Sequence, residues 1–117
     1  MYSKTYKGKT VLVTGASGFK GSWLSIWLND LGAEVIGYSF EPNFKEDNFV
    51  VCNLENKINH IEGDLLDYKK LLSVFEKYNP EIIFHLGAQA LVLDGIKNPK
   101  NTFDSNMMGT VNVLEAI

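Results

Sequence analysis

The chain has 117 residues, of which 45% are hydrophobic and 21% are charged, and these values are typical of a single globular domain. A net charge of −3 with scattered lysines provides no basic surface for nucleic acid or for an anionic membrane. The polar amino terminus lacks a signal peptide, no apolar run approaches the about 20 residues of a membrane span, and the single cysteine, Cys52, excludes an internal disulfide, so we expect a cytoplasmic protein.

The first part of the chain alternates between strand and helix patterns. Residues 10–14 form a short β-branched run, which predicts a strand that is buried on both faces. A helix is expected to begin at Phe19 and to end before Gly32, and its apolar stripe is expected to pack on the sheet through Phe19, Trp23, Ile26, Trp27 and Leu31. Residues 34–40 predict the second strand.

The middle of the chain has weaker patterns. Residues 41–56 read as a loop, within which residues 48–54 favour a short helix. Residues 57–61 alternate between polar and apolar side chains and predict a third strand. Asp67 is expected to cap a further helix, which Pro80 prevents from continuing.

The last third of the chain predicts a fourth strand at residues 81–86 and a final helix from about residue 102 to residue 117, whose inner side is expected to carry Val111, Leu114 and Ile117. Strands that are separated by helices run parallel, because a helical crossover returns the chain to the same end of the sheet. Right-handed crossovers then predict an α/β fold, the amino-terminal half of a doubly wound parallel sheet with strand order 3-2-1-4.

Three glycines at a spacing of three lie between the first strand and the first helix. Gly15 is expected to let the chain turn sharply, Gly18 to admit a pyrophosphate against bare backbone, and Gly21 to let the helix lie close to the sheet. Backbone N–H groups and the helix dipole favour phosphate at such a turn. We therefore predict a dinucleotide site with contacts from Gly15, Ser17, Gly18, Phe19, Lys20 and Gly21, against the alternative of a glycine-rich turn without a ligand.

The end of the second strand is where a dinucleotide-binding protein reads the adenosine ribose, usually through an acid. Ser39 stands at the place of that acid, and Glu41 follows two residues later. Glu41 either reaches the ribose from the loop or is an exposed residue without a ligand. Because no arginine lies nearby to neutralise a 2′-phosphate, we expect NAD rather than NADP.

Short polar and small side chains follow the third and fourth strands. Asp64 and Leu65 are expected to contact the adenine, with the alternative that Asp64 only caps a turn. His60 is expected on the strand surface. His85 is expected to be a hydrogen-bonded core residue, with a catalytic base as the alternative, and the spacing of the two histidines does not suit a metal. The segment expected to lie near the nicotinamide ribose consists of Leu86, Gly87, Ala88 and Gln89.

These motifs resemble the extended short-chain dehydrogenase/reductase superfamily. The resemblance rests on the glycine loop, on the Gly-Asp pair at residues 63–64, on the Gly-Ala-Gln segment at residues 87–89 and on residues 106–116. It implies a Rossmann-like fold and adds Asn106 to the cofactor site. Within the superfamily, the segment Gly-Phe-Lys-Gly-Ser-Trp-Leu at residues 18–24 is similar to the CDP-glucose 4,6-dehydratases, which implies tightly held NAD and a nucleotide-sugar substrate.

In the dehydratases that this chain resembles, NAD takes a hydride from C4 of the sugar, water leaves across C5 and C6, and the hydride returns at C6. A Tyr-x-x-x-Lys pair carries the proton transfers there. None of the five tyrosines of this chain has a lysine four positions later. We therefore expect residues 1–117 to be the NAD-binding, amino-terminal portion of a longer enzyme and to be inactive alone, with the catalytic pair and a sugar-nucleotide domain beyond Ile117.

A second difference from these dehydratases lies at residues 90–95, which read Ala-Leu-Val-Leu-Asp-Gly where the family usually has Pro-Leu-Val-Arg-Arg-Ser. Asp94 reverses the local charge, which argues against CDP-glucose itself. The alternatives are another nucleotide-sugar epimerase or reductase, a non-catalytic dinucleotide-binding or interaction module, and an inactive remnant. Because half of a doubly wound sheet leaves apolar surface beside the fourth strand, we also expect a homo-oligomer.

Overall fold

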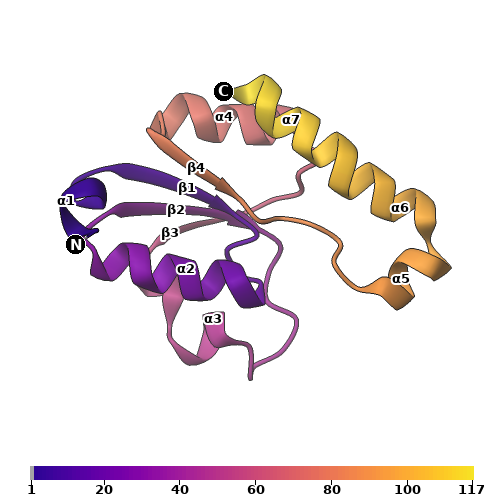
Figure 1. Ribbon diagram of the computed structural model, residues 1–117, viewed down its shortest axis with the longest axis horizontal. Coiled ribbons are helices and arrows are strands. Elements are labelled where there is room, and N and C mark those ends of the chain that lie inside the picture. Colours follow the sequence, from indigo (N-terminus) through magenta and orange to yellow (C-terminus); the bar gives the residue numbers. More distant parts are fainter. Residues whose placement is uncertain (1) are drawn as a thin grey trace.

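The computed structural model describes residues 2–117, and its elements follow the predicted alternation of strands and helices (Figure 1). Four strands form one parallel sheet in the order β3-β2-β1-β4. They are β1 (Thr10–Thr14), β2 (Glu34–Ser39), β3 (Asn59–Glu62) and β4 (Ile82–His85). The predicted α/β class and strand order are therefore confirmed, with β3 beginning at Asn59 rather than at residue 57.

The helical elements are α1 (Ser3–Tyr6), α2 (Phe19–Asp30), α3 (Asn48–Val51), η1 (Leu54–Asn56), α4 (Tyr68–Tyr78), α5 (Val92–Lys97), α6 (Pro99–Phe103), η2 (Asp104–Met108) and α7 (Gly109–Ala116). Sequence patterns did not predict α1 or α5. The expected final helix is continuous from Pro99 through a π-helical turn, η2, to Ala116. Within residues 2–117, no helix combines the length and the apolar character that crossing a membrane requires.

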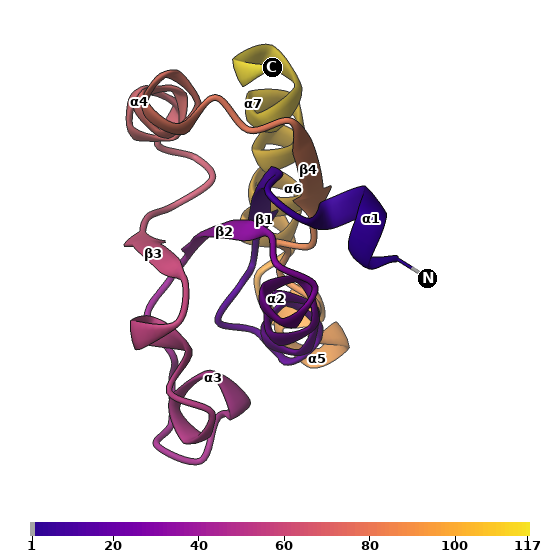
Figure 2. The ribbon, with the colours of Figure 1, turned by 90° about the vertical axis from the view of Figure 1, so that its left-hand side faces the viewer.

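Helices cover both faces of the sheet (Figures 1 and 2). On one face, α2 and α3 enclose a core that includes Val13, Val35 and Phe49. On the other face, α4 and α7 enclose a core that includes Leu12 and Leu71. Because β1 lies between two strands and under both helical layers, its apolar side chains are fully buried, as a strand buried on both faces requires.

Capping residues mark the two ends of α4. The Asp67 carboxylate accepts the Lys70 N–H at 3.1 Å, which confirms the predicted amino-terminal cap. At the other end, Asn79 adopts a left-handed conformation with φ of 44°, and Pro80 follows. The helix therefore ends where the proline predicts, because proline cannot donate the next backbone hydrogen bond.

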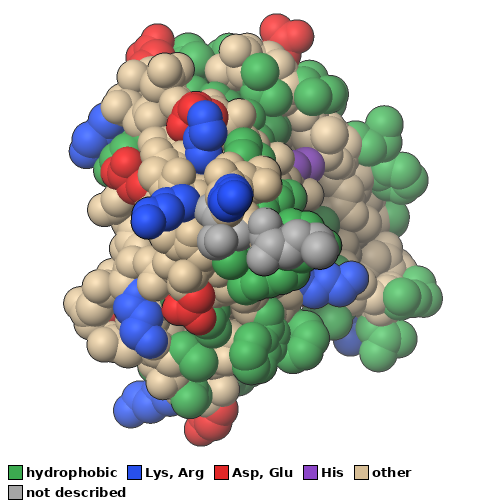
Figure 3. All heavy atoms as spheres, turned by 60° about the vertical axis from the view of Figure 1, so that its left-hand side comes forward, with side chains coloured by type: hydrophobic (Ala, Val, Ile, Leu, Met, Phe, Trp, Pro, Cys, Tyr) green, Lys and Arg blue, Asp and Glu red, His purple; other side chains and the backbone are tan. Residues whose placement is uncertain are grey.

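The apolar stripe predicted for α2 is wrong for its aromatic residues, whereas Ile26 is partly buried and packs against the core as predicted. Trp23 and Trp27 are each 54% exposed and Phe19 is 80% exposed, so these rings point away from the sheet. The buried face of the helix instead consists of Gly21, Ser22, Ser25 and Leu28. At Gly21 a side chain has no room, because the amino end of α2 lies against the glycine loop. Hydrophobic side chains are consequently exposed on the side of the molecule that carries the amino terminus (Figure 3).

The inner side predicted for the final helix is also wrong. Val111, Leu114 and Ile117 are 43%, 66% and 72% exposed, and the buried positions of α7 are Gly109, Val113 and Ala116. A Cβ at Gly109 would lie 3.1 Å from the Cβ of Leu65, so the helix meets the segment after β3 through its smallest residue. In both α2 and α7, close approach selects a face with small side chains over the face with the largest apolar ones.

Candidate functional site

The glycine loop turns at Gly15, immediately after β1. Its φ of +71° lies in the left-handed region, which L side chains adopt at a cost. The Gly15 N–H donates to the Tyr38 carbonyl at 2.9 Å, and the Gly15 carbonyl accepts the Gly18 N–H at 3.0 Å. A Cβ at Gly15 would also lie 2.8 Å from the backbone nitrogen of Gly87. The sharp turn predicted for Gly15 is therefore observed, and it places the loop against the end of β4.

Gly21 allows α2 to pack closely on the loop, and Gly18 leaves the backbone of the loop accessible to a ligand. A Cβ at Gly21 would lie 2.0 Å from the Gly15 carbonyl oxygen, so only glycine lets α2 begin this close to the loop. Gly18 is exposed and has ordinary extended dihedral angles, φ −74° and ψ 175°. A Cβ there would touch only the Gly15 carbonyl oxygen, at 3.2 Å, and would otherwise project into open space. The outer surface of the loop at Gly18 is thus bare backbone.

The amino end of α2 is suited to an anion. Gly18 is the N-cap residue of this 12-residue helix, and no side chain among the described residues 2–117 makes a capping hydrogen bond there. The first N–H groups of a helix have no partner inside the helix, and the dipole adds partial positive charge at the same end. Phe19 and Lys20, the first two residues of the helix, are exposed. Uncapped donors next to bare backbone are what the pyrophosphate of a dinucleotide requires, and the residues present fit such a group.

Ser39, at the tip of β2, is held by two partners. Its Oγ accepts the Ser17 N–H at 3.1 Å and lies 2.8 Å from Nε2 of His60. The Ser17 hydroxyl donates to the Phe40 carbonyl at 2.7 Å, which fastens the glycine loop to the end of β2. Ser39 is only 7% exposed, whereas Glu41 is exposed in the following loop. The structure therefore brings Ser17 and Ser39 together, while the Glu41 side chain is exposed to solvent.

The prediction that His60 lies on the strand surface is wrong. The imidazole is half-buried and packs on the Phe49 ring with a centroid distance of 4.8 Å. Burial lowers the pKa of His60 below its ordinary value, against the opposing effect of three acidic side chains, Glu41, Glu55 and Glu62. A neutral imidazole therefore stands behind Ser39 at neutral pH.

The segment after β3 is fixed by Tyr38. The Tyr38 hydroxyl donates to the Asp64 carbonyl at 2.8 Å, and burial, with smaller effects of Asp67 and Asp64, raises the pKa of Tyr38 to about 12. One oxygen of the Asp64 carboxylate accepts the Leu66 N–H at 2.9 Å, which is the turn-capping role considered for this residue. Leu65 points toward β4, because a Cβ at Gly87 would lie 2.8 Å from its Cδ1.

Beyond β4, the chain is fixed by side chains from β1 and from the final helix. Thr14 Oγ1 accepts the N–H groups of Leu86 and Gly87 at 3.1 and 3.0 Å. Asn106 binds the backbone of Gln89 on both sides: its Oδ1 accepts the Gln89 N–H at 2.7 Å and its Nδ2 donates to the Gln89 carbonyl at 3.0 Å. Ala88 lies between these two anchors and is exposed.

Sequence patterns missed the residues that hold these loops. Thr14, Thr110 and Thr102 bind, in order, the amides after β4, the His85 imidazole and the Gln89 side chain, the last at 2.9 Å. In the sequence these residues are marked only by their hydroxyl side chains, one at the end of β1 and two on the final helix. Within the described residues, no group of three or more His, Cys, Asp or Glu side chains could hold a metal ion.

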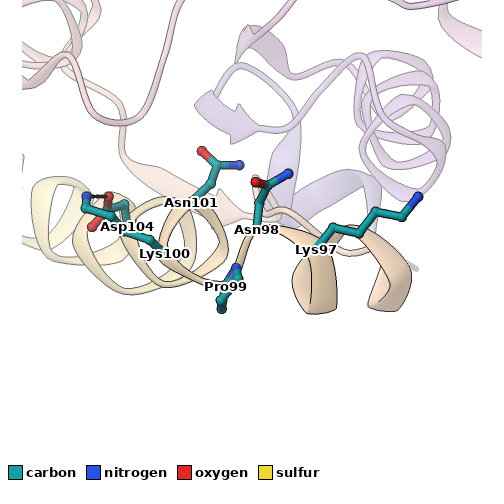
Figure 4. Close-up of a pocket in the computed structure, with 6 residues that line it drawn as sticks. All are labelled: Lys97, Asn98, Pro99, Lys100, Asn101 and Asp104. Carbon is teal, nitrogen blue, oxygen red and sulfur yellow. Dashed lines mark hydrogen bonds and ion pairs between the residues drawn. The ribbon is translucent and has the colours of Figure 1, made fainter.

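A hollow of about 440 Å³ lies away from the predicted site, at the junction of α5 and α6 (Figure 4). Its lining consists of Lys97, Asn98, Pro99, Lys100, Asn101 and Asp104. Lys100 and Asp104 pair with each other across one helical turn. None of these residues belongs to the predicted cofactor contacts, and the hollow is formed by exposed side chains on one edge of the molecule.

Comparison with known proteins assigns the chain to a family. A family model described as GDP-mannose 4,6 dehydratase matches residues 12–117. The chain belongs to this family. A curated relative, the CDP-glucose 4,6-dehydratase of Salmonella typhimurium, is 41% identical over 112 residues, which cover 96% of this chain and 31% of the relative. UDP-glucuronate 4-epimerase 1 of Arabidopsis thaliana is 37% identical over 113 residues, which cover 92% of this chain and 26% of the relative.

A solved structure extends the likeness to the fold. The UDP-glucose-4-epimerase of Stenotrophomonas maltophila, with bound NAD and formylated UDP-arabinopyranose, has a TM-score of 0.81 at 26% identity, and the match covers 92% of this chain and 33% of that protein. The predicted membership of the epimerase/dehydratase branch of the extended short-chain dehydrogenase/reductase superfamily is thus confirmed. The chain spans 31% and 26% of the lengths of the two curated relatives.

Proposed function

We propose that this chain is the NAD-binding part of a nucleotide-sugar 4,6-dehydratase similar to the CDP-glucose enzymes. The observation that carries the proposal is the loop at Gly15, Gly18 and Gly21, which presents bare backbone and an uncapped helix end to an anion. Its support from relatives is the dehydratase of 41% identity over nearly the whole chain. An epimerase is 37% identical over a similar length, so epimerisation is the second candidate reaction.

The proposed cofactor contacts divide along the sheet edge. The pyrophosphate would lie at Gly18, Phe19, Lys20 and Gly21, and the adenosine would lie between Ser39 and the Asp64–Leu65 segment. The nicotinamide ribose would lie at the Leu86–Gln89 segment, with Asn106 holding Gln89 in place. NAD is proposed over NADP because residues 34–48, which contain the tip of β2, include a single cation, Lys45, and no arginine.

The chemistry of a complete enzyme would begin and end at that cofactor. In a dehydratase, bound NAD accepts a hydride from C4 of the hexose and returns it to C6 after water has left across C5 and C6. The proton transfers need a basic group near neutral pH, which a Tyr-x-x-x-Lys pair supplies in relatives and which residues 1–117 do not contain. We therefore propose that this chain binds cofactor without turning over a nucleotide hexose, and a measurable 4-keto product from the purified chain would refute this.

A calorimetric titration tests the cofactor proposal. We expect NAD to bind more tightly than NADP, and a Gly18→Leu variant to lose binding because its side chain projects into the space of the pyrophosphate. Asn101→Leu, at an exposed position on α6, is the matched control and should bind as the original chain does. Equal NAD affinity of the original chain and Gly18→Leu would exclude the glycine loop as the phosphate site.

Two further expectations remain proposals. The exposed apolar residues of α7 favour a homo-oligomer, which light scattering after size exclusion can test directly. The free thiol of Cys52, half-buried beside Asn48, fits a reducing compartment, and we propose the cytoplasm.

A further inference from the structure

A chain of hydroxyl groups and one imidazole crosses the carboxyl edge of the sheet from β1 to the final helix. Thr14, at the end of β1, is completely buried, and its Oγ1 lies 2.7 Å from Nδ1 of His85 on β4. On the other side of the ring, Nε2 of His85 lies 3.0 Å from Oγ1 of Thr110 on α7. The Thr110 hydroxyl lies 2.6 Å from the carbonyl oxygen of Asn106 in the preceding turn.

The number of protons on each group determines the direction of every hydrogen bond in this series. A threonine hydroxyl has one proton and two lone pairs. Thr14 Oγ1 accepts the Gly87 N–H and also the Leu86 N–H, which it shares with the Thr14 carbonyl at 3.3 Å, and this leaves the hydroxyl proton of Thr14 for His85 Nδ1. Nδ1 therefore carries no proton. Nε2 carries the proton of the neutral ring and donates it to Thr110.

The hydrogen bonds of Thr110 run in the same donor-to-acceptor direction. Its hydroxyl accepts the Nε2 proton of His85 and donates its own proton to the Asn106 carbonyl, because a carbonyl oxygen can only accept. The two hydroxyls and the imidazole are thus each used once as a donor within the series, which ends at the Asn106 carbonyl. A second proton on His85 would find no partner at Nδ1, because both acceptor sites of Thr14 are already occupied.

We propose that His85, as the neutral Nε2–H tautomer, is a positioning residue that couples the loop after β4 to the π-helical turn of the final helix. Thr14 holds the start of this loop at Leu86 and Gly87, and Asn106 holds its end at Gln89. His85 links the two anchors through Thr14 on one side and Thr110 on the other. The inference rests on the proposed function only in assigning the nicotinamide ribose to this loop.

The surroundings of His85 favour its neutral form. Burial lowers the pKa of the imidazole below its ordinary value, and no charged group among the described residues contributes to that shift. The charged residues on or beside the neighbouring elements face other partners: Glu81, just before β4, pairs with Lys9, and Asp104 on η2 pairs with Lys100. Glu115 on α7 is exposed. The coupling is therefore intact at neutral pH and is lost as acid protonates the ring.

Nitrogen NMR of the imidazole rings tests the tautomer without any cofactor. The chain has two histidines, so a His60→Gln variant leaves His85 as the single ring in the spectrum. At pH 7.5 we expect Nδ1 to show the shift of an unprotonated ring nitrogen and Nε2 to show an attached proton. A proton on Nδ1, or rapid averaging between the two tautomers, would overturn the proposal.

Thr110 variants test the positioning role. Thr110→Val removes the acceptor of the Nε2 proton at similar volume, and Thr110→Ser keeps the hydroxyl. We expect the valine variant to lose about tenfold in the exchange protection of the Leu86 and Gly87 amides, and about tenfold in NAD affinity, while the serine variant behaves as the original chain does. Unchanged amide protection in a folded Thr110→Val would refute the coupling. If the original chain binds no NAD, the proposed function fails, and the amide protection still decides the inference.

Discussion

Replacing Gly21 by alanine introduces one methyl group where the first helix meets the glycine loop. That methyl would lie 2.0 Å from the Gly15 carbonyl oxygen, 2.7 Å from the Gly15 carbonyl carbon and 3.0 Å from the Ala16 Cα. All three neighbours are backbone atoms, so relief requires α2 to move outward by about 1 Å or more, given that real Cβ atoms keep at least 3.0 Å from other heavy atoms. Overpacking of this kind costs about 1–3 kcal/mol of the free energy of unfolding.

Urea unfolding followed by circular dichroism measures that loss. With a slope of about 1–3 kcal/mol per molar urea, we expect the midpoint of Gly21→Ala to fall by about 1 M. Gly95→Ala is the matched control, because Gly95 lies within α5 and its added Cβ would come no closer than 3.5 Å to Thr102 Oγ1. The control should be unchanged or more stable by about 0.5–1 kcal/mol. Equal midpoints for Gly21→Ala and the original chain would refute close packing at this helix end.

Three other outcomes follow from the geometry. Leu28→Ala should lower the free energy of unfolding by about 2–5 kcal/mol, because Leu28 is buried, and Trp27→Ala should lower it much less, because Trp27 is half exposed. A larger loss for Trp27→Ala than for Leu28→Ala would show that the tryptophan side of α2 packs on the sheet. Asp67→Ala should cost about 1 kcal/mol through the lost cap, Asp67→Asn should recover most of it, and equal melting temperatures for all three chains would contradict the cap. The free energy of unfolding should decrease as the pH falls from 7 through the ordinary pKa of histidine, because folding lowers the pKa of His60 and of His85 and the unfolded chain therefore binds more protons. A His60→Gln, His85→Gln double variant should lose this part of the pH dependence. An unchanged pH profile in the double variant would contradict the prediction.

The sheet was predictable because its signals are local. β1 and β2 are apolar runs of the expected length, and the helices between strands require parallel pairing, which leaves few possible orders. The cap at Asp67 and the stop at Pro80 depend only on their own residues, and both were located correctly. The positions of these elements needed no knowledge of how they pack.

The orientations of the helices could not be predicted from hydrophobicity alone. Periodicity selected the face of α2 with the largest apolar residues, Trp23 and Trp27, although the packing role expected of Gly21 already implied the other face. Residues four and seven positions after Gly21 are Ser25 and Leu28, both of which are buried. A glycine required for close approach therefore determines the inward side of a helix more strongly than bulky side chains do.

The candidate site was predicted as positions rather than as contacts. Gly15, Ser39, Asp64 and Gly87 lie at or just after the carboxyl ends of the four strands, and parallel strands bring such positions to one edge. The hydrogen bonds that fix the edge join residues far apart in the sequence, such as Thr14 with His85 and Gln89 with Asn106. No local pattern contains these pairs, because the first depends on the register of β1 with β4 and the second on where the final helix meets the loop after β4.

We propose that the glycine loop and the loop after β4 hold the two ends of one NAD molecule. Titration of NAD into the isotope-labelled chain, followed through backbone amide resonances, tests it most directly. We expect the amides of Gly18–Gly21 and of Gly87–Gln89 to shift together with one affinity, while those of α5 stay in place. Shifts confined to other surfaces, or no shifts at saturating NAD, would contradict the claim.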